Sequence, residues 1–225
     1  MSGTEKTKIL VDIALCVLLV FCMGFQFWGT LVHEAAGTLM LLCFILHNIL
    51  NRRWYMSLFK GRYSWLRLVF TISVALVFAD MLVMAYTSMV ISHYVFSFLP
   101  KFGSMAQAHR LHLWGSYLGM VLMSLHLGLH WTKFVPIANV FRLINLPHTS
   151  LVILPKLVAC AIASYGAYVF VRNDCWEYLL LKRHFAEVDN AMSAGMFYVD
   201  YFAMLGAGVF LAHYAIKFFK TIGRG

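Results

Sequence analysis

The chain has 225 residues, of which 62% are hydrophobic and only 12% are charged. A soluble fold of this size could not cover so much apolar surface, so the composition indicates an integral membrane protein. The formal net charge of +9 comes from basic residues between apolar segments, which is a membrane-topology signal, and no RNP motif, zinc finger or arginine-rich run in the sequence supports nucleic-acid binding.

Six apolar segments approach or exceed the length that crosses a bilayer. About 20 residues are needed, because an α-helix rises about 1.5 Å per residue and the hydrocarbon core is about 30 Å thick. We predict an all-α, polytopic membrane helix bundle that forms a single transmembrane domain over residues 1–225, with a four-helix core at 9–131 and two additional helices at 150–217. The predicted spans are 9–29, 31–51, 66–91, 107–131, 150–171 and 197–217.

Lysine and arginine are distributed unevenly between these spans. With the N-terminus inside, twelve of them fall on the inner side and five on the outer side, which predicts that both termini are cytoplasmic. The inner residues are Lys6, Lys8, Arg52, Arg53, Lys60, Arg62, Arg67, Lys133, Arg142, Lys217, Lys220 and Arg224, and the outer residues are Lys101, Arg110, Arg172, Lys182 and Arg183. We expect an extracytoplasmic partner to dock on the two sizeable outer segments, 92–106 and 172–196.

The second and fourth spans each carry two histidines fourteen residues apart, His33 with His47 and His112 with His126. Fourteen residues of α-helix turn through about 1400° and rise about 21 Å, so each pair lies on one helix face with one histidine near each membrane surface. The two spans run in the same direction because one helix separates them. His33 is therefore expected level with His112, and His47 level with His126.

Two imidazoles that face each other at one level can occupy both axial positions of a haem iron. Four buried histidines without a ligand would be costly in hydrocarbon. We therefore predict two haem groups between the second and fourth spans. His33 and His112 would hold the outer iron, and His47 and His126 the inner iron.

Small and basic residues near these histidines complete the predicted cofactor site. Gly37 and Gly119 reduce the bulk where a porphyrin would lie, although small residues are also common at ordinary helix contacts in membranes. Arg53 and Arg110 stand near the inner and outer levels, where a guanidinium can pair with a haem propionate. For Arg53 the positive-inside signal of a cytoplasmic loop is an equally good explanation.

Two further histidines leave the choice of ligands open. His130 lies one turn beyond His126 on the same helix face, and His109 lies just before His112. Either could replace a predicted ligand or hydrogen-bond a propionate. The equal spacing of the two histidine pairs favours His112 with His126.

Acidic residues also occur in or near the spans. Carboxylates within a membrane are candidates for functional roles, as proton carriers or as partners of buried cations. Asp80 lies deepest within a predicted span. Asp12 and Asp200 stand near span ends, where a role at the membrane interface explains them equally well. Glu34 follows His33 directly and could orient that ligand, contact a quinone or face water.

These features resemble the flavinylation-associated cytochromes, a family of small bacterial membrane cytochromes. The matching residues are Val11-Asp12-Ile13, His33-Glu34 with His47, and His112 with His126 followed by His130 and Trp131. The ligand layout is also similar to that of the wider dihaem cytochrome b group, which includes ferric-reductase and hydrogenase b subunits. The resemblance covers the chain loosely and the first four spans best.

This resemblance implies two haem b groups in a protein of the bacterial cytoplasmic membrane. Such families move electrons between a quinone pool or a cytoplasmic donor and an extracytoplasmic redox protein, typically a flavoprotein with covalently bound FMN. We accordingly interpret the chain as an electron-transfer subunit of an oxidoreductase, with a quinone as a candidate substrate and no catalytic residue of its own. Two alternatives remain: a haem-free transporter or channel with a histidine proton relay, and a membrane-anchor subunit of a redox complex.

Overall fold

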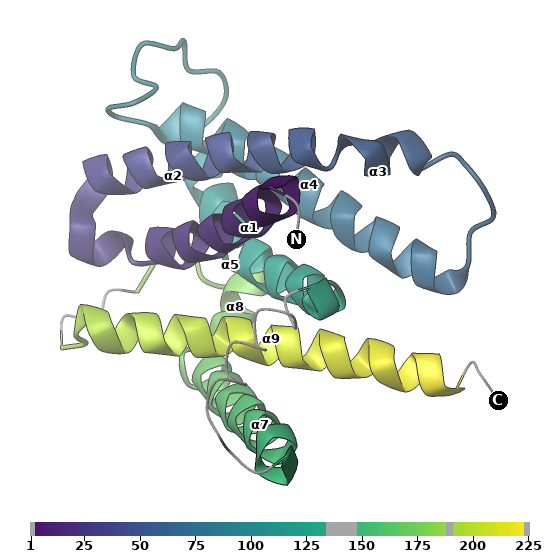
Figure 1. The fold of residues 1–225 in the computed structure, drawn as a ribbon. Helices are drawn as coiled ribbons and strands as arrows, with labels where there is room; N and C mark the ends of the chain where they lie inside the picture. Colours follow the sequence, from purple (N-terminus) through teal and green to yellow (C-terminus); the bar gives the residue numbers. More distant parts are fainter. Residues whose placement is uncertain (1–2, 134–147, 188–190, 223–225) are drawn as a thin grey trace.

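The structure, a computed structural model, describes residues 3–133, 148–187 and 191–222, and helices dominate these ranges (Figure 1). The long helices are α1 (Gly3–Met23), α2 (Phe25–Leu50), α4 (Trp65–Ile91), α5 (Met105–Leu129), α7 (His148–Arg172) and α9 (Ala194–Ile222). The short helices are α3 (Arg52–Ser57), η1 (Trp131–Lys133) and α8 (Cys175–Leu179). The described ranges contain no β-strand, so the all-α prediction is confirmed.

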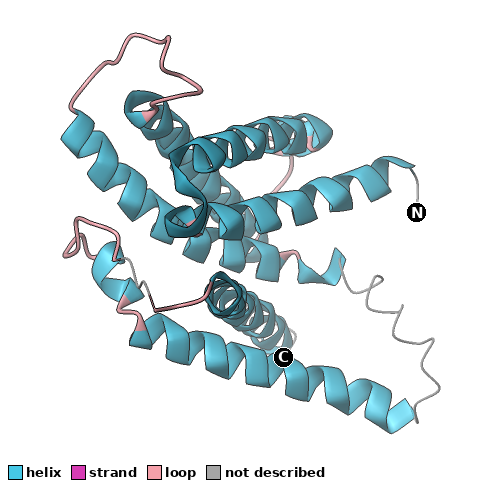
Figure 2. Ribbon diagram, turned by 90° about the vertical axis from the view of Figure 1, so that its left-hand side faces the viewer, coloured by secondary structure: helices cyan, strands magenta, loops and turns pink. Residues whose placement is uncertain are grey.

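The long helices pair as three hairpins, α1 with α2, α4 with α5, and α7 with α9. Helix α5 also packs along α9 and so joins the second hairpin to the third. Figure 2 shows the same arrangement from the side, with loops confined to the helix ends. We call the end of the bundle where α2 begins the His33 end, and the end where α2 finishes the His47 end.

Four helical segments of the described chain are long and apolar enough to cross a membrane. They are Phe25–Leu50, Trp65–Ile91, Ile153–Arg172 and Ala194–Thr221. These helices expose large apolar side chains, Leu76 and Leu211 among them, as helices surrounded by lipid do. The prediction of a multi-pass membrane protein is therefore confirmed in this coarser form.

Helices α1 and α5 are 21 and 25 residues long but less apolar. Lys6 and Lys8 lie in the first two turns of α1, and α5 contains three histidines and Arg110. Polar residues of this kind lower the mean hydropathy of a helix whatever their role. Arg142 and Arg224, used in the topology prediction, and residues 188–190 of the predicted docking segment lie outside the described residues.

The turn between the first two helices differs from the sequence prediction. We expected the first span to end at residue 29, whereas α1 ends at Met23 and Gly24 makes the turn. Gly29 then breaks the helical path within α2, with φ +74° and ψ 177°. Only glycine adopts such a conformation readily. The chain therefore bends twice before His33.

The starts of α4 and α5 follow capping signals in the sequence. Ser64 accepts a hydrogen bond from the backbone N–H of Arg67 (3.3 Å) at the start of α4, and Ser104 accepts one from Gln107 (3.4 Å) at the start of α5. A serine at this position satisfies one of the unpaired N–H groups of a first helical turn. These helices begin within two residues of their predicted starts, residues 66 and 107.

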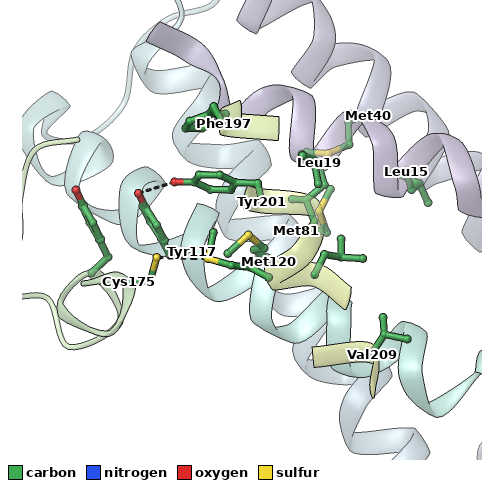
Figure 3. Close-up of a cluster of buried hydrophobic side chains, with 14 of the residues drawn as sticks. Leu15, Leu19, Met40, Met81, Tyr117, Met120, Cys175, Phe197, Tyr201 and Val209 are labelled. Atoms are coloured by element: carbon green, nitrogen blue, oxygen red, sulfur yellow. Dashed lines mark hydrogen bonds between the residues drawn. The ribbon is translucent and has the colours of Figure 1, made fainter. Parts of the chain in front are cut away.

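The apolar core lies where α1, α2, α4, α5 and α9 meet (Figure 3). Met81, Met120 and Tyr201 are each at least nine-tenths buried there. The hydroxyl groups of Tyr117 and Tyr201 lie 3.2 Å apart, and Tyr117 stacks on Tyr178 of α8 with ring centroids 4.0 Å apart. Helix α8 is thus packed onto the core at the His33 end.

Candidate functional site

A cavity of about 810 Å³ separates the α1–α2 hairpin from the α4–α5 hairpin. Its walls are mainly apolar, with methionines from α2, α4 and α5, and its polar lining includes His33, Asp80 and His112. A volume of this size, with apolar walls and few polar groups, is typical of a site for a small molecule or cofactor.

His33 and His112 face each other across this cavity. Their ring centroids are 6.0 Å apart and the ring planes meet at 72°. Two bonds of about 2 Å to one metal, with about 1 Å from each ring centre to its nitrogen, would separate the centroids by about 6 Å. The centroid separation of His33 and His112 therefore matches the spacing of two imidazoles bound to one iron. They come from α2 and α5, as the equal histidine spacing predicted.

The position of His33 depends on the bend before it. Gly29 reorients the chain one turn earlier, and Trp28 anchors the bend by donating a hydrogen bond from Nε1 to the hydroxyl of Tyr198 (2.6 Å). Nδ1 of His33 is buried and has no hydrogen-bond partner in the described chain, although the ring lies near the main chain of Cys22.

A polar stripe on α4 meets the histidine face of α5 in steps of seven residues. Ser73 lies 3.2 Å from Nδ1 of His126, and Thr87 lies 3.3 Å from Nδ1 of His112. Midway between them, Asp80 lies against Gly119. Seven residues are nearly two helical turns, so antiparallel helices stay in register over such a repeat.

The contact with Thr87 fixes which nitrogen of His112 is protonated. The Thr87 hydroxyl lies 2.8 Å from the backbone carbonyl of Val83, and a carbonyl can only accept. With its single hydrogen directed to that carbonyl, the hydroxyl accepts from Nδ1–H of His112. The lone pair of that imidazole is then on Nε2, the nitrogen that a metal would use.

His47 also donates from Nδ1, but to a carboxylate instead of a hydroxyl. Its Nδ1 lies 2.7 Å from Oδ1 of Asp12, on the neighbouring helix α1. The carboxylate accepts and the imidazole donates, so in the neutral ring the lone pair lies on Nε2. A carboxylate that orients a ligating histidine in this way is a recurrent feature of metal sites. The interfacial explanation of Asp12 is therefore incomplete, because Asp12 positions a predicted ligand.

At the His47 end the predicted pair is less clearly assembled than at the His33 end. Neither His47 nor His126 lines the cavity described above. His130 caps the C-terminus of α5, with its ring 4.8 Å from His126 and 5.0 Å from Phe70. The choice between His126 and His130 as the inner ligand stays open, and the contact between Ser73 and His126 favours His126.

The predicted small and basic residues divide into two groups. Gly37 lines the cavity, and a Cβ added there would meet no atom within 4 Å. Gly119 also lines the cavity, but a Cβ there would lie 2.5 Å from Oδ2 of Asp80, so this glycine makes room for a carboxylate. Arg110 lines the cavity, whereas Arg53 is exposed on α3 beyond the end of α2.

Glu34 ties α2 to the chain that follows α4. Its carboxylate accepts hydrogen bonds from the hydroxyl of Ser92 (2.7 Å) and from the backbone N–H groups of His93, Tyr94 and Val95 (2.7, 3.0 and 2.9 Å). Three of these donors meet Oε2 and one meets Oε1. Glu34 therefore holds the two hairpins together beside His33, a role that the sequence left undecided.

The described residues contain no group of three or more His, Cys, Asp and Glu side chains that could hold a bare metal ion. Axial coordination of a haem needs only two, since the porphyrin supplies the other ligands. The cysteines are free, and burial together with the charge of Asp174 raises the pKa of Cys175 to about 12. That thiol stays protonated at neutral pH.

Sequence reasoning assigned no role to Ser73 or Thr87, although both contact predicted ligands. The seven-residue spacing of Ser73, Asp80 and Thr87 was a usable signal, since it equals the spacing of His112, Gly119 and His126. To predict which residue of α4 contacts which residue of α5, one must know how the two helices are aligned along their axes, and the sequence alone does not supply that alignment.

No protein-family model, curated protein or solved structure matches this chain. The resemblance to membrane cytochromes therefore rests only on the residues and spacings of this chain.

Proposed function

We propose that this chain is a b-type dihaem cytochrome with six transmembrane helices that carries electrons across the bacterial cytoplasmic membrane. Its donor would be a quinol or a cytoplasmic-side reductant, and its acceptor an extracytoplasmic redox protein such as a flavoprotein. In this proposal α1 and α5 cross the membrane together with the four more apolar helices. The excess of basic residues at the His47 end favours a cytoplasmic location for that end and for both termini.

One observation carries the proposal. His33 and His112 approach from different hairpins to a centroid separation of 6.0 Å, on either side of an apolar cavity large enough for a cofactor. The Nδ1 atoms of His112 and His47 donate to Thr87 and Asp12, which leaves Nε2 with its lone pair on both rings. In this proposal both rings would bind iron through Nε2, the nitrogen that these contacts leave without a proton in the neutral imidazole.

The chain's own residues would bind and shield the cofactors. When bound, haem supplies a one-electron ferric/ferrous couple, and two imidazole ligands leave no open position for oxygen chemistry. His33 and His112 would hold the group at one end, and His47 and His126 the group at the other. The methionines of the cavity wall would pack against the cofactor, and Arg110, which also lines the cavity, would pair with a propionate.

The deciding measurement is a reduced-minus-oxidised visible spectrum of the purified protein, with pyridine haemochrome quantitation. We expect a low-spin b-type spectrum and two haems per chain. His33→Ala and His112→Ala should each leave one haem. His93 and His184 also line the cavity but are not predicted ligands. The matched controls His93→Ala and His184→Ala should therefore keep both haems.

The other outcomes separate the alternatives. A folded wild-type protein without haem, from a host that supplies it, would exclude the cytochrome and leave the transporter with a histidine relay. Haem that a quinol does not reduce would favour an anchor subunit. Two haems in both His33→Ala and His112→Ala would show that the pairing is wrong.

A further inference from the structure

Asp80 lies in the middle of α4 and lines the cavity between the α1–α2 and α4–α5 hairpins. Its side chain is only 7% exposed, and its Oδ1 has no hydrogen-bond partner in the described chain. Two glycines of α5 face the carboxylate, since an added Cβ would lie 3.4 Å from Oδ1 at Gly115 and 2.5 Å from Oδ2 at Gly119. These glycines leave room for a carboxylate without giving Oδ1 a donor.

The cavity extends from Asp80 to the surface of the protein at the His33 end. There its rim is formed by four exposed side chains that are basic or can take up a proton. They are His93, His109, Arg110 and His184. Asp80 is therefore connected to the aqueous surface at this end of the bundle.

Two hydroxyl groups also line the cavity, one on α2 and one on α5. Thr38 and Ser116 donate to the backbone carbonyls of Glu34 and Leu113, over 2.8 Å in each case. The lone pairs of both hydroxyl oxygens can therefore accept hydrogen bonds from water. Water needs polar partners and about 30 Å³ per molecule, and this part of the cavity offers both.

Two aromatic rings close the path from Asp80 to the opposite end of the bundle. Phe44 of α2 and Phe78 of α4 pack with their ring centroids 5.6 Å apart, and neither ring lines the cavity. Phe78 precedes Asp80 by two residues, on the side that leads to the His47 end. Aromatic rings give water no comparable polar partners. The described chain therefore gives Asp80 access to water from the His33 end.

The chemistry of this position suits a very small positive ligand. A carboxylate without a partner is costly in apolar surroundings, and carboxylates within a membrane are functional candidates by default. A metal cation such as Ca²⁺ or Mg²⁺ takes several oxygen ligands. The described residues contain no group of three or more His, Cys, Asp and Glu side chains that could hold one. A proton needs only the carboxylate itself.

We propose that Asp80 binds and releases a proton that it exchanges with water at the His33 end. The cavity is then a half-channel, meaning a water-accessible path into the membrane that is open at one end only. The proton adds to a carboxylate oxygen to give the neutral acid and leaves by the reverse step. No electron moves and no other bond changes.

This inference does not rest on the proposed function. A group held between His33 and His112 would lie about 10 Å nearer the rim, because seven residues of α4 separate Asp80 from Thr87, the partner of His112. Other titratable or charged side chains line the same cavity from every neighbouring element. They are Cys22 of α1, His33 and Glu34 of α2, His109, Arg110 and His112 of α5, and His93 and His184 of the loops.

Infrared spectroscopy of the purified, reconstituted protein tests the proposal, because a protonated carboxyl group absorbs apart from an ionised one. We expect a protonated-carboxyl band that is lost in Asp80→Asn. The control Asp174→Asn should keep the band, since Asp174 is partly exposed and paired with Arg183. The ratio of protonated to ionised Asp80 should change about tenfold per pH unit across the titration.

The band can also be assigned without a variant, because the chain has only nine Asp and Glu residues. Aspartate that is isotopically labelled at the side-chain carboxyl carbon should shift the band, whereas labelled glutamate should not. A band that belongs to glutamate would overturn the proposal. So would the absence of a titrating band at every pH at which the protein stays folded.

The side of access can be measured in vesicles with a strongly buffered interior. The end of α9 contacts the start of α4 through Phe219 and Trp65, so a cleavable C-terminal tag reports the position of the His47 end. After a pH jump outside, the band should respond only in the molecules whose His33 end faces outward. A response in the opposite fraction would overturn the proposal. Loss of the band on addition of Na⁺ at constant pH would also overturn it, in favour of a metal-cation site.

Phe44→Ala tests the closed end of the half-channel. Without this ring, the band should respond to the pH on both sides of the membrane. The matched control is Phe70→Ala, because the Phe70 ring contacts His130 and not α2. That variant should keep the one-sided response. A one-sided response in a folded Phe44→Ala protein would overturn the assignment of Phe44 and Phe78 as the barrier.

Discussion

The α4–α5 and α7–α9 hairpins each bury one aspartate, and the two carboxylates have opposite surroundings. Asp200 on α9 is fully buried, accepting hydrogen bonds from the hydroxyl of Tyr165 (2.6 Å) and from the guanidinium of Arg172 (2.5 Å). Asp80 on α4 is 93% buried, yet its Oδ1 has no hydrogen-bond partner in the described chain.

Backbone packing differs in the same way. In the α7–α9 hairpin, a Cβ on Gly166 would overlap the carbonyl of Ala203, so the two backbones are in contact. The α4–α5 hairpin packs closely on one side and borders the cavity on the other, where Gly37 of α2 faces open space. A saturated carboxylate in a tight hairpin indicates a structural role, whereas an unpartnered one beside a cavity indicates a role that involves an occupant.

The largest expected effect on stability comes from Arg172→Met. This variant leaves the carboxylate of Asp200 buried without its cation, which should cost about 3 kcal/mol of unfolding free energy, measured by thermal or SDS-induced unfolding in detergent. The double variant Arg172→Met with Asp200→Leu should recover most of the loss.

The matched control is Arg183→Met. Arg183 pairs with Asp174, Glu177 and Glu187, which are all partly exposed, so its loss should cost less than about 1 kcal/mol. Equal losses of unfolding free energy for Arg172→Met and Arg183→Met would show that the buried ion pair of Asp200 stabilises the protein no more than the exposed pairs of Arg183.

A smaller effect should separate two glycines. Gly166→Ala forces the α7 and α9 backbones apart and should cost about 1–3 kcal/mol. Gly37→Ala meets no atom within 4 Å and should cost nothing, since alanine has the higher helix propensity. Both variants can be compared in one unfolding assay, and a destabilised Gly37→Ala protein would show that the cavity beside α2 is narrower than described.

Much of the helical architecture was predictable from the sequence, because long apolar segments in a membrane have few alternatives to the helix. Serine caps also marked where α4 and α5 begin. The turn after α1 was misplaced because Gly24 and Gly29 both interrupt an otherwise continuous apolar run. A hydropathy pattern does not record which glycine takes a conformation closed to other residues.

The candidate site was predictable only in part. The spacing of fourteen residues placed His33 and His112 at one level, and these rings do meet in the structure. The partners of the histidines were not predictable, because Asp12, Ser73 and Thr87 act across helix contacts whose rotation and register are tertiary properties. The Glu34 contacts depend likewise on a chain reversal 58 residues later.

A double-mutant cycle tests whether Asp80 and Gly119 pack as one unit. Gly119→Ala puts a methyl group 2.5 Å from Oδ2 of Asp80 and should destabilise the protein. Asp80→Ala removes that carboxylate, so Gly119→Ala should be tolerated in a protein that already carries Asp80→Ala. We expect a coupling of about 0.5–2 kcal/mol in unfolding measurements, and additive effects would contradict the packing.

The smallest effect should come from Asp80→Asn, and this variant sharpens the contrast with Asp200. Asparagine keeps the shape of the side chain but carries no charge. Because no cation pairs with Asp80 in the described chain, its replacement should change the unfolding free energy by less than about 1 kcal/mol, or raise it. Asp200→Asn should be clearly destabilising in the same assay, since it weakens the contact with Arg172. If Asp80→Asn proved as costly as Asp200→Asn, the carboxylate of Asp80 would have to be stabilised as a charge, and both hairpins would then use their aspartate to hold the fold together.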